Sequence, residues 1–230
     1  MLYYLVKDLL PKYSSTSQIP PQSADGSQLP PKYKIFIDGI WLLDRLRFEK
    51  ALDHLTQPAL TPTFPDEILY TLCKHASSSS DVSLPVAYYQ CVSPPLASSL
   101  VLETYFAVMC RASVTEAFYF SRAQGEEKHQ VLFKKLIEVV LEQSSGERKA
   151  NQGLELISLP LNEMEEKWFQ EILTGANQSK LKGAADTLIM RNIALGRTEG
   201  LGDTVGMTQN RKLNGVNWGS LAKTLQRASG

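Results

Sequence analysis

Apolar residues recur every three to four positions over most of the chain, which predicts helices rather than strands. The clearest case is the stretch 36–55, where two such series meet at a tight corner and predict two short amphipathic helices. Neither series is stable alone in water, so each must bury its apolar face against the other and against neighbouring helices. The small residues Gly39 and Ala51 would let backbones approach closely at these crossings. The core residues predicted from this stretch and from its later counterpart are Trp41, Leu43, Phe48, Ala51, Leu52, Ala117 and Phe118.

The same periodicity, with start and stop signals, predicts further helices along the chain. We expect four consecutive serines, 77–80, to break one of them, and the segment 144–153 to be a polar loop. Asn162 is predicted to cap a helix that runs through Leu173, with three glutamates in its first turn. No strand is predicted anywhere. The predicted helices cover 2–10, 65–75, 83–92, 97–112, 114–121, 126–143, 163–173 and 182–195.

Some of these helices belong to a degenerate sequence repeat. The corner before Val114, Ala117 and Phe118 is followed by the same small and large apolar pair as the corner before Phe48. Such repetition predicts an all-α fold, an irregular α-solenoid of stacked helical hairpins in which each unit buries its face against its neighbours. The expected domains are an N-terminal helix (1–10), a Pro/Ser-rich linker (11–33), a helical domain (34–203) and a Gly-rich basic tail (204–230), disordered unless a partner holds it.

Composition narrows the class of protein. The 230 residues are 43% hydrophobic and 21% charged, and the formal net charge is zero. The chain therefore lacks the excess positive charge that would attract bulk nucleic acid or an anionic membrane. The three cysteines are an odd number and widely spaced, which argues against a disulfide framework and favours a reducing compartment. The opening residues lack a cleavage site, and no apolar run approaches the ~20 residues that cross a bilayer. We therefore expect a soluble intracellular protein.

Possible metal chemistry is limited to two places. Glu126 and His129 have the spacing of half a di-iron helix-bundle site, but the other histidines have no Glu three residues earlier to supply the second half. We interpret the pair as the solvated, charged start of a helix. Cys73 and His75 are too close together for a structural zinc site, so the cysteines are interpreted as buried apolar thiols.

Other candidate chemistry is weaker. The glutamates Glu163, Glu165 and Glu166 lie where a helix dipole favours negative charge, which indicates capping rather than acid and base catalysis. Gly200 and Gly202 begin a dinucleotide-like pattern that no strand precedes. We therefore predict no catalytic, cofactor-binding or metal-binding residue and no cofactor. The tail offers possible partner-binding residues, which could instead remain a passive solvated segment: Arg211, Lys212, Trp218 and Leu221.

Several ordered pieces of the sequence resemble the ELYS-like helical domain of nuclear pore proteins. The similarity covers roughly residues 1–200, and its strength lies in the order of the pieces because no single one is diagnostic. The main piece is Ile40, Trp41, Leu42, Leu43, Asp44, Arg45, Phe48, Glu49, Ala51, Leu52, Leu55, Thr56 and Pro58. The others are Pro65, Ile68, Leu69; Ala87, Tyr88, Tyr89, Pro94, Pro95; Val114, Glu116, Ala117, Phe118, Arg122; and Leu159, Pro160, Leu161, Glu165, Glu166.

The resemblance implies a non-enzymatic scaffold nucleoporin of the nuclear envelope. Such a protein attaches to the Y-shaped outer-ring complex, contacts nucleoporins of its short arm, and supports pore assembly and the transport of mRNA and protein. The chain resembles a short, fungal-type member without an N-terminal propeller. Gly196 and Arg197 are followed by Thr198 and Glu199 rather than by a basic hook, so a chromatin role is not carried over. Direct DNA binding, membrane insertion and a small-molecule ligand are not expected.

Two alternatives remain open on the sequence alone. A generic helical-repeat adaptor of another large assembly would share the architecture, because fold analogy does not identify a partner. A helical metal-dependent enzyme would have to use Glu126 and His129.

Overall fold

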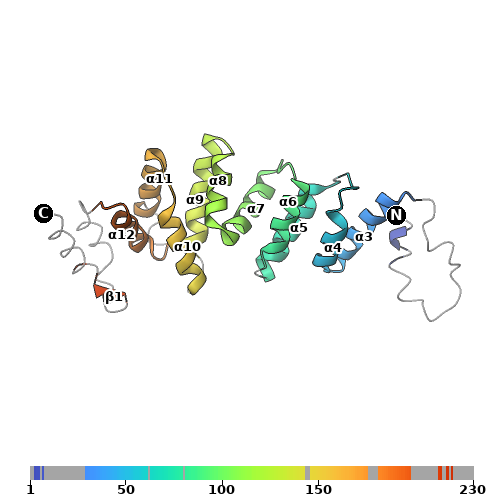
Figure 1. The fold of residues 1–230 in the computed structure, drawn as a ribbon, viewed down its shortest axis with the longest axis horizontal. Helices are drawn as coiled ribbons and strands as arrows, with labels where there is room; N and C mark the ends of the chain where they lie inside the picture. The colour runs from blue at the N-terminus through green and yellow to red at the C-terminus, as the bar shows by residue number, and fades with distance from the viewer. Residues whose placement is uncertain are drawn as a thin grey trace. The chain divides into compact units, whose positions relative to one another are not determined.

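The computed structural model describes residues 3–5, 7, 29–61, 63–79, 81–142, 146–175, 181–197, 212–213, 216–217 and 219. The described part is almost entirely helical, which confirms the predicted all-α class (Figure 1). The chain divides into two compact units, Met1–Val108 and Met109–Gly230, with helix α7 (Ser99–Ala112) spanning the division. Residues 3–5 and 7, within the predicted first helix, are helical.

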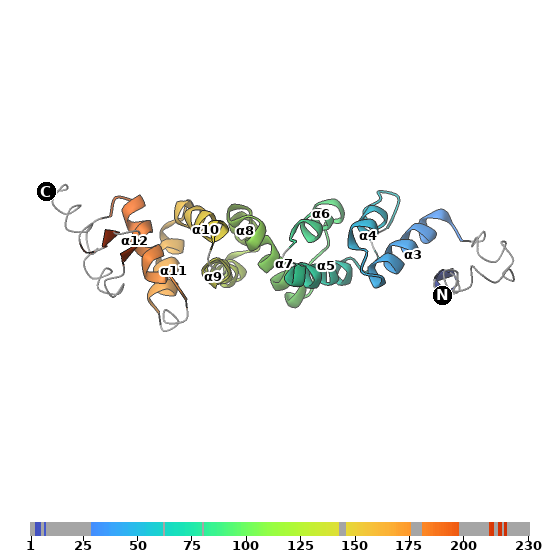
Figure 2. The same ribbon diagram turned by 90° about the horizontal axis from the view of Figure 1, so that it is seen from below.

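In the first unit, helices pack mainly on their neighbours in sequence. Helix α3 (Pro31–Asp44) packs on α4 (Phe48–Leu55), α5 (Pro65–Ser79) packs on α6 (Ser83–Val92), and α4 also contacts α6 (Figure 2). Helix α3 begins three residues before the expected domain start at residue 34. The corner between α3 and α4 contains Leu46 with a φ of 58°.

The α3–α4 crossing depends on a small residue. A Cβ added to Gly39 would lie 2.6 Å from Leu55 Cγ, well inside van der Waals contact. Ala51 is completely buried, which fits the same close approach. The predicted two-helix corner and its need for Gly39 are therefore confirmed.

Helix α5 corrects one prediction. It continues through Ser79, whereas the serine run was expected to break it. The Ser77 hydroxyl donates to the Cys73 carbonyl at 3.0 Å, within the helix. A serine that bonds back to the preceding turn leaves the backbone helical, so a run of serines need not end the helix.

Between residues 114 and 197, the described part of the second unit forms helices α8 to α12. Helices α8 (Val114–Arg122) and α9 (Glu126–Glu142) pack together, and α10 (Glu147–Ser158) contacts both. Helix α11 (Glu163–Thr174) contacts α9 and α12 (Ala184–Ala194), and α12 also contacts α10. The fully buried rings of Phe118, Phe133 and Phe169 form the core, with centroids 5.9 and 6.5 Å apart in succession.

Helix α10 corrects a second prediction, because its first seven residues fall in the expected polar loop 144–153. Its inward face includes the polar residue Gln152, which is 5% exposed. Because an apolar residue is expected at such a position, Gln152 interrupts the pattern from which a helix would be predicted. The Gln152 amide donates to the Arg111 carbonyl at 2.8 Å. A polar side chain is buried here because it bonds one of the carbonyls left open at the end of α7.

The tail contains a minimal strand pair. Strands β1 (Lys212–Leu213) and β2 (Val216–Asn217) pair antiparallel, with Lys212 opposite Asn217. The prediction that no strand forms is therefore wrong at this point. The sequence signal was present, since Asn214 and Gly215 between the strands are the preferred residues of a two-residue hairpin turn.

The three cysteines are not joined in disulfides, and they do not share one environment. Cys73 and Cys110 are fully buried, and burial raises the pKa of the Cys110 thiol. Cys91 is exposed on α6, so its assignment as a buried thiol is wrong. Among the helices described, none is both long and apolar enough to cross a membrane.

Candidate functional site

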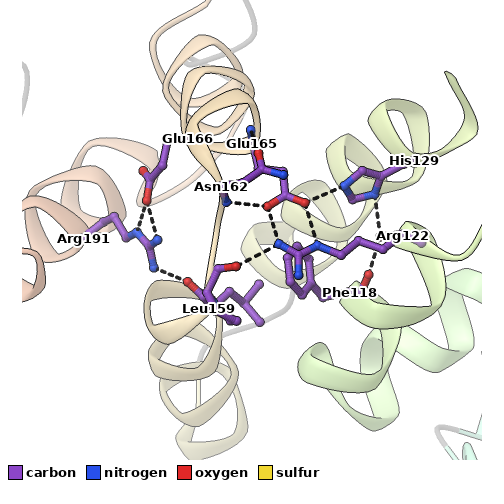
Figure 3. A network of polar contacts seen from close by, with 10 residues as sticks. Phe118, Arg122, His129, Leu159, Asn162, Glu165, Glu166 and Arg191 are labelled. Carbon is purple, nitrogen blue, oxygen red and sulfur yellow. Dashed lines mark hydrogen bonds and ion pairs between the residues drawn. The ribbon is translucent and has the colours of Figure 1, made fainter. Parts of the chain in front are cut away.

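Charged side chains converge in the second unit on Glu165, the third residue of α11 (Figure 3). This carboxylate is 1% exposed and accepts hydrogen bonds from groups on three parts of the chain. Arg122 of α8 donates from Nε at 2.7 Å and from Nη2 at 2.6 Å, and His129 Nε2 of α9 lies at 2.9 Å. The backbone N–H of Asn162 donates at 2.7 Å. Glu165 therefore joins α8, α9 and the start of α11.

The local sequence explains how Glu165 is positioned. Asn162 Oδ1 accepts a hydrogen bond from the Glu165 N–H at 2.9 Å, and the Glu165 carboxylate accepts one from the Asn162 N–H, which is a capping box. The predicted Asn162 cap is thus confirmed. The positive end of the helix favours a carboxylate at this point.

The carboxyl of Glu165 stays ionised despite its burial. Burial raises its pKa, but hydrogen bonds from Arg122, the Asn162 N–H and His129 more than offset this and lower the pKa to about 2. The same contact raises the pKa of Arg122. The group is therefore an anion at neutral pH, bonded to donors on several sides, rather than a proton donor for catalysis.

His129 is buried, 7% exposed, and bonded at both ring nitrogens. Its Nδ1 lies 3.0 Å from Ser121 Oγ, which donates to the Phe118 carbonyl, and its Nε2 faces Glu165. The interpretation of Glu126 and His129 as a solvated helix start is therefore wrong for His129, because the Glu165 carboxylate on α11 supplies a partner inside the unit. Glu126 is exposed. Among the described residues, no three His, Cys, Asp or Glu side chains are grouped to hold a metal ion.

A second charge cluster holds the connection between α10 and α11. Arg191 of α12, 3% exposed, donates to the carbonyls of Ile157 and Leu159, the latter at 2.7 Å, and pairs with Glu166. From the other side, Arg122 Nη2 donates to the Pro160 carbonyl at 2.9 Å. Two arginines therefore bind the consecutive carbonyls of residues 159 and 160 (Figure 3).

Two hollows lie beside this connection. The larger, of 690 Å³, is lined by Leu159, Pro160, Glu166, Arg191 and Leu195 among others, and the smaller, of 460 Å³, by Leu154 and Glu155 among others. The least exposed of the charged residues that line the larger hollow, Glu166 and Arg191, are bonded to each other. This arrangement fits a structural surface better than a site that acts on a substrate.

The structure places the sequence-predicted residues as follows. Leu43 and Phe48 are buried, Ala51, Ala117 and Phe118 are completely buried, and Trp41 and Leu52 are half-buried. Among the possible partner-binding residues, Lys212 lies in β1, while Arg211, Trp218 and Leu221 lie outside the described residues. No sequence pattern indicated that Ser121 would bond His129, or that His129 and Arg191 would bond the α11 glutamates. The N-x-x-E pattern at Asn162 and Glu165 is the sequence signal from which the capping box could have been predicted.

The fold and the network define a class of protein: an all-helical protein whose buried charges bond to one another and hold its helices together. The chain belongs to the ELYS family, described as acting in nuclear pore complex assembly, and the match covers residues 1–176. Membership of this family places the protein in the nucleus, at the nuclear pore complex, and confirms the resemblance seen in the sequence.

Among curated proteins, the chain is 31% identical over 164 residues to the protein ely5 of Schizosaccharomyces pombe. The match covers 71% of this chain and 49% of the relative, so the chain spans about half the length of that protein. No solved structure matches the chain significantly.

Proposed function

We propose that this chain is a non-enzymatic scaffold nucleoporin that attaches to the Y-shaped outer-ring complex of the nuclear pore through nucleoporins of its short arm. In that position it supports pore assembly and the nucleocytoplasmic transport of mRNA and protein. The observation that carries the proposal is the family match over residues 1–176. The chain is then a helical surface for other proteins, with no cofactor and no direct role in binding DNA.

The contacts within the second unit support a scaffold role. Glu165 and Arg191 are almost completely buried and bond to helices and backbone carbonyls of their own unit. Breaking a buried charge pair by removing one partner costs roughly 3–5 kcal/mol, so such groups favour one fixed arrangement. We propose that the helical hairpins continue this arrangement as an irregular α-solenoid in residues 34–203, preceded by a linker (11–33) and followed by a partner-binding tail (204–230).

Affinity purification tests the attachment. The tagged full chain, purified from nuclear envelopes, is expected to bring down outer-ring nucleoporins identified by mass spectrometry. Recovery of a different assembly in their place would support a generic helical-repeat adaptor and reject the proposal.

A matched pair of variants shows whether binding needs the folded first unit. Ala51→Lys places a charge at a completely buried position and is expected to unfold the α3–α4 hairpin and reduce recovery. Ala150→Lys makes the same change at an exposed position of α10 and is expected to leave both the melting temperature and recovery unchanged. An unchanged melting temperature for Ala51→Lys would contradict burial at that site.

A further inference from the structure

The described part of the N-terminal segment (residues 3–5 and 7) contacts α3 within the first unit. The Tyr3 hydroxyl donates to Asp38 Oδ1 at 3.1 Å, and the Tyr4 hydroxyl donates to Asp44. Lys7 forms an ion pair with Asp38, and its ammonium lies 5.0 Å from the centre of the Trp41 ring. The segment is thus held by polar and cation–π contacts.

These contacts define a recognition surface on α3. Asp38, Trp41 and Asp44 are spaced three residues apart, so they share one side of the helix, and we call them the α3 strip. The strip binds an ammonium between a carboxylate and an indole, and binds phenol hydroxyls through its two carboxylates. The indole Nε1 of Trp41 is buried and has no hydrogen-bond partner within the described residues.

Contacts with the α3 strip come from Tyr3, Tyr4 and Lys7. Lys7 follows Tyr4 by three residues and Tyr3 by four, so each tyrosine neighbours Lys7 on the helical segment, while Leu5 is 53% exposed. Lys7 and Asp38 remain 28% and 22% exposed, so water and salt screen their attraction. Contacts of this kind are individually weak, and a segment of the same chain makes them more readily than a separate molecule because its effective concentration is high.

We propose that the α3 strip is a docking surface for a partner helix that carries a tyrosine and, three or four residues later, a lysine or arginine. The chain's own N-terminal segment has that chemistry and occupies the strip as an intramolecular competitor. A partner helix must displace it, so the segment sets a threshold of affinity or local concentration for docking. This inference goes beyond the outer-ring attachment and does not depend on it.

A direct test uses a fluorescein-labelled peptide with the sequence of residues 1–8 and measures its binding to the full chain by fluorescence anisotropy. The variant Tyr3→Phe/Tyr4→Phe/Lys7→Ala weakens the intramolecular competitor without altering α3. We expect the peptide to bind this variant roughly tenfold more tightly than the unaltered chain. Equal binding to both proteins would overturn the proposal.

Charge-matched substitutions then locate the binding surface. In the variant background, Asp38→Asn is expected to weaken peptide binding about tenfold, because it removes the carboxylate that the lysine meets. Asp53→Asn, an exposed position on α4, removes the same charge elsewhere and is expected to leave binding unchanged. Loss of binding in both, or in neither, would show that the peptide does not use the α3 strip. Far-UV circular dichroism confirms that each variant is folded.

A second measurement needs no substitution. Zero-length carbodiimide cross-linking of the unaltered chain is expected to join Lys7 to Asp38, and added peptide is expected to reduce that product while its own lysine joins Asp38. If the Lys7–Asp38 product persists at saturating peptide while the peptide joins other carboxylates, the competition is refuted.

Discussion

At the scale of single residues, the ionised state of Glu165 is the feature on which the charge network of the second unit depends. Its partners could not be predicted from the sequence, although its place in the first turn of α11 and the Asn162 cap could. Capping is a local property of neighbouring residues. The bond to Arg122 joins residues 43 positions apart, and only the packing of α8 against the rest of the unit brings them together.

The lowered pKa of Glu165 makes the stability of the second unit depend on pH. The folded pKa of about 2 lies below the ordinary value of 4.5, so the stabilisation is complete above pH 4.5 and is lost as the pH falls towards 2. Glu165→Gln is expected to lower the free energy of unfolding by about 3 kcal/mol at pH 7. It should also flatten the pH dependence in the acid range.

Urea denaturation at several pH values, followed by the fluorescence of Trp168, measures this effect. Glu163→Gln is the matched control, because Glu163 is in the same first turn but exposed. A Glu165→Gln protein that retains the full acid sensitivity of the unaltered chain would show that other carboxylates cause it.

At the scale of helices, the sequence predicted the type of element better than its ends. The apolar periodicity of α3, α4, α6, α8, α9, α11 and α12 was sufficient to place them. It failed where polar residues belong to the helix: Ser77 bonds inside α5, and Gln152 is buried to bond the end of α7. In both cases a hydrogen bond replaces the apolar contact that the pattern detects.

The α3–α4 crossing provides a prediction at this scale. Gly39→Ala is expected to destabilise the first unit by about 1–2 kcal/mol, because overpacking against buried Leu55 outweighs the gain of about 1 kcal/mol in helix propensity. Gly153→Ala in α10 meets nothing within 4 Å of the new Cβ and is expected to stabilise by up to about 1 kcal/mol. Thermal melting of the two variants compares them, and stabilisation by both would mean that Leu55 moves aside without cost.

At the scale of the whole molecule, the all-α class could be predicted from the sequence. The apolar periodicity recurs in many helices, so an error at one helix does not change the predicted class. The family resemblance came from short sequence motifs that occur in a fixed order along the chain. The structure shows that residues from separate motifs bond to each other. Arg122 and Glu165, two of those residues, bond to each other, and Arg122 also bonds Pro160, a third. The repeat-like similarity of the corners did not predict the charge network, because it concerns small and large apolar residues.

Removal of residues 204–230 tests the tail. The helical signal in circular dichroism is expected to remain nearly intact, because α12 ends at Ala194. Binding to the partner nucleoporins is expected to weaken if Trp218 anchors them, as measured by the recovery of outer-ring nucleoporins. Unaltered recovery would show that the tail is passive.

The two arginines at Leu159 and Pro160 have a mechanical consequence. A short connection between helices is ordinarily the compliant point at which they pivot, but here guanidinium groups from α8 and α12 bind its backbone from both sides. A force applied to α11 would therefore be passed on to α8, α10 and α12 instead of being absorbed as bending at the connection. This part of the unit would then transmit load as a rigid piece.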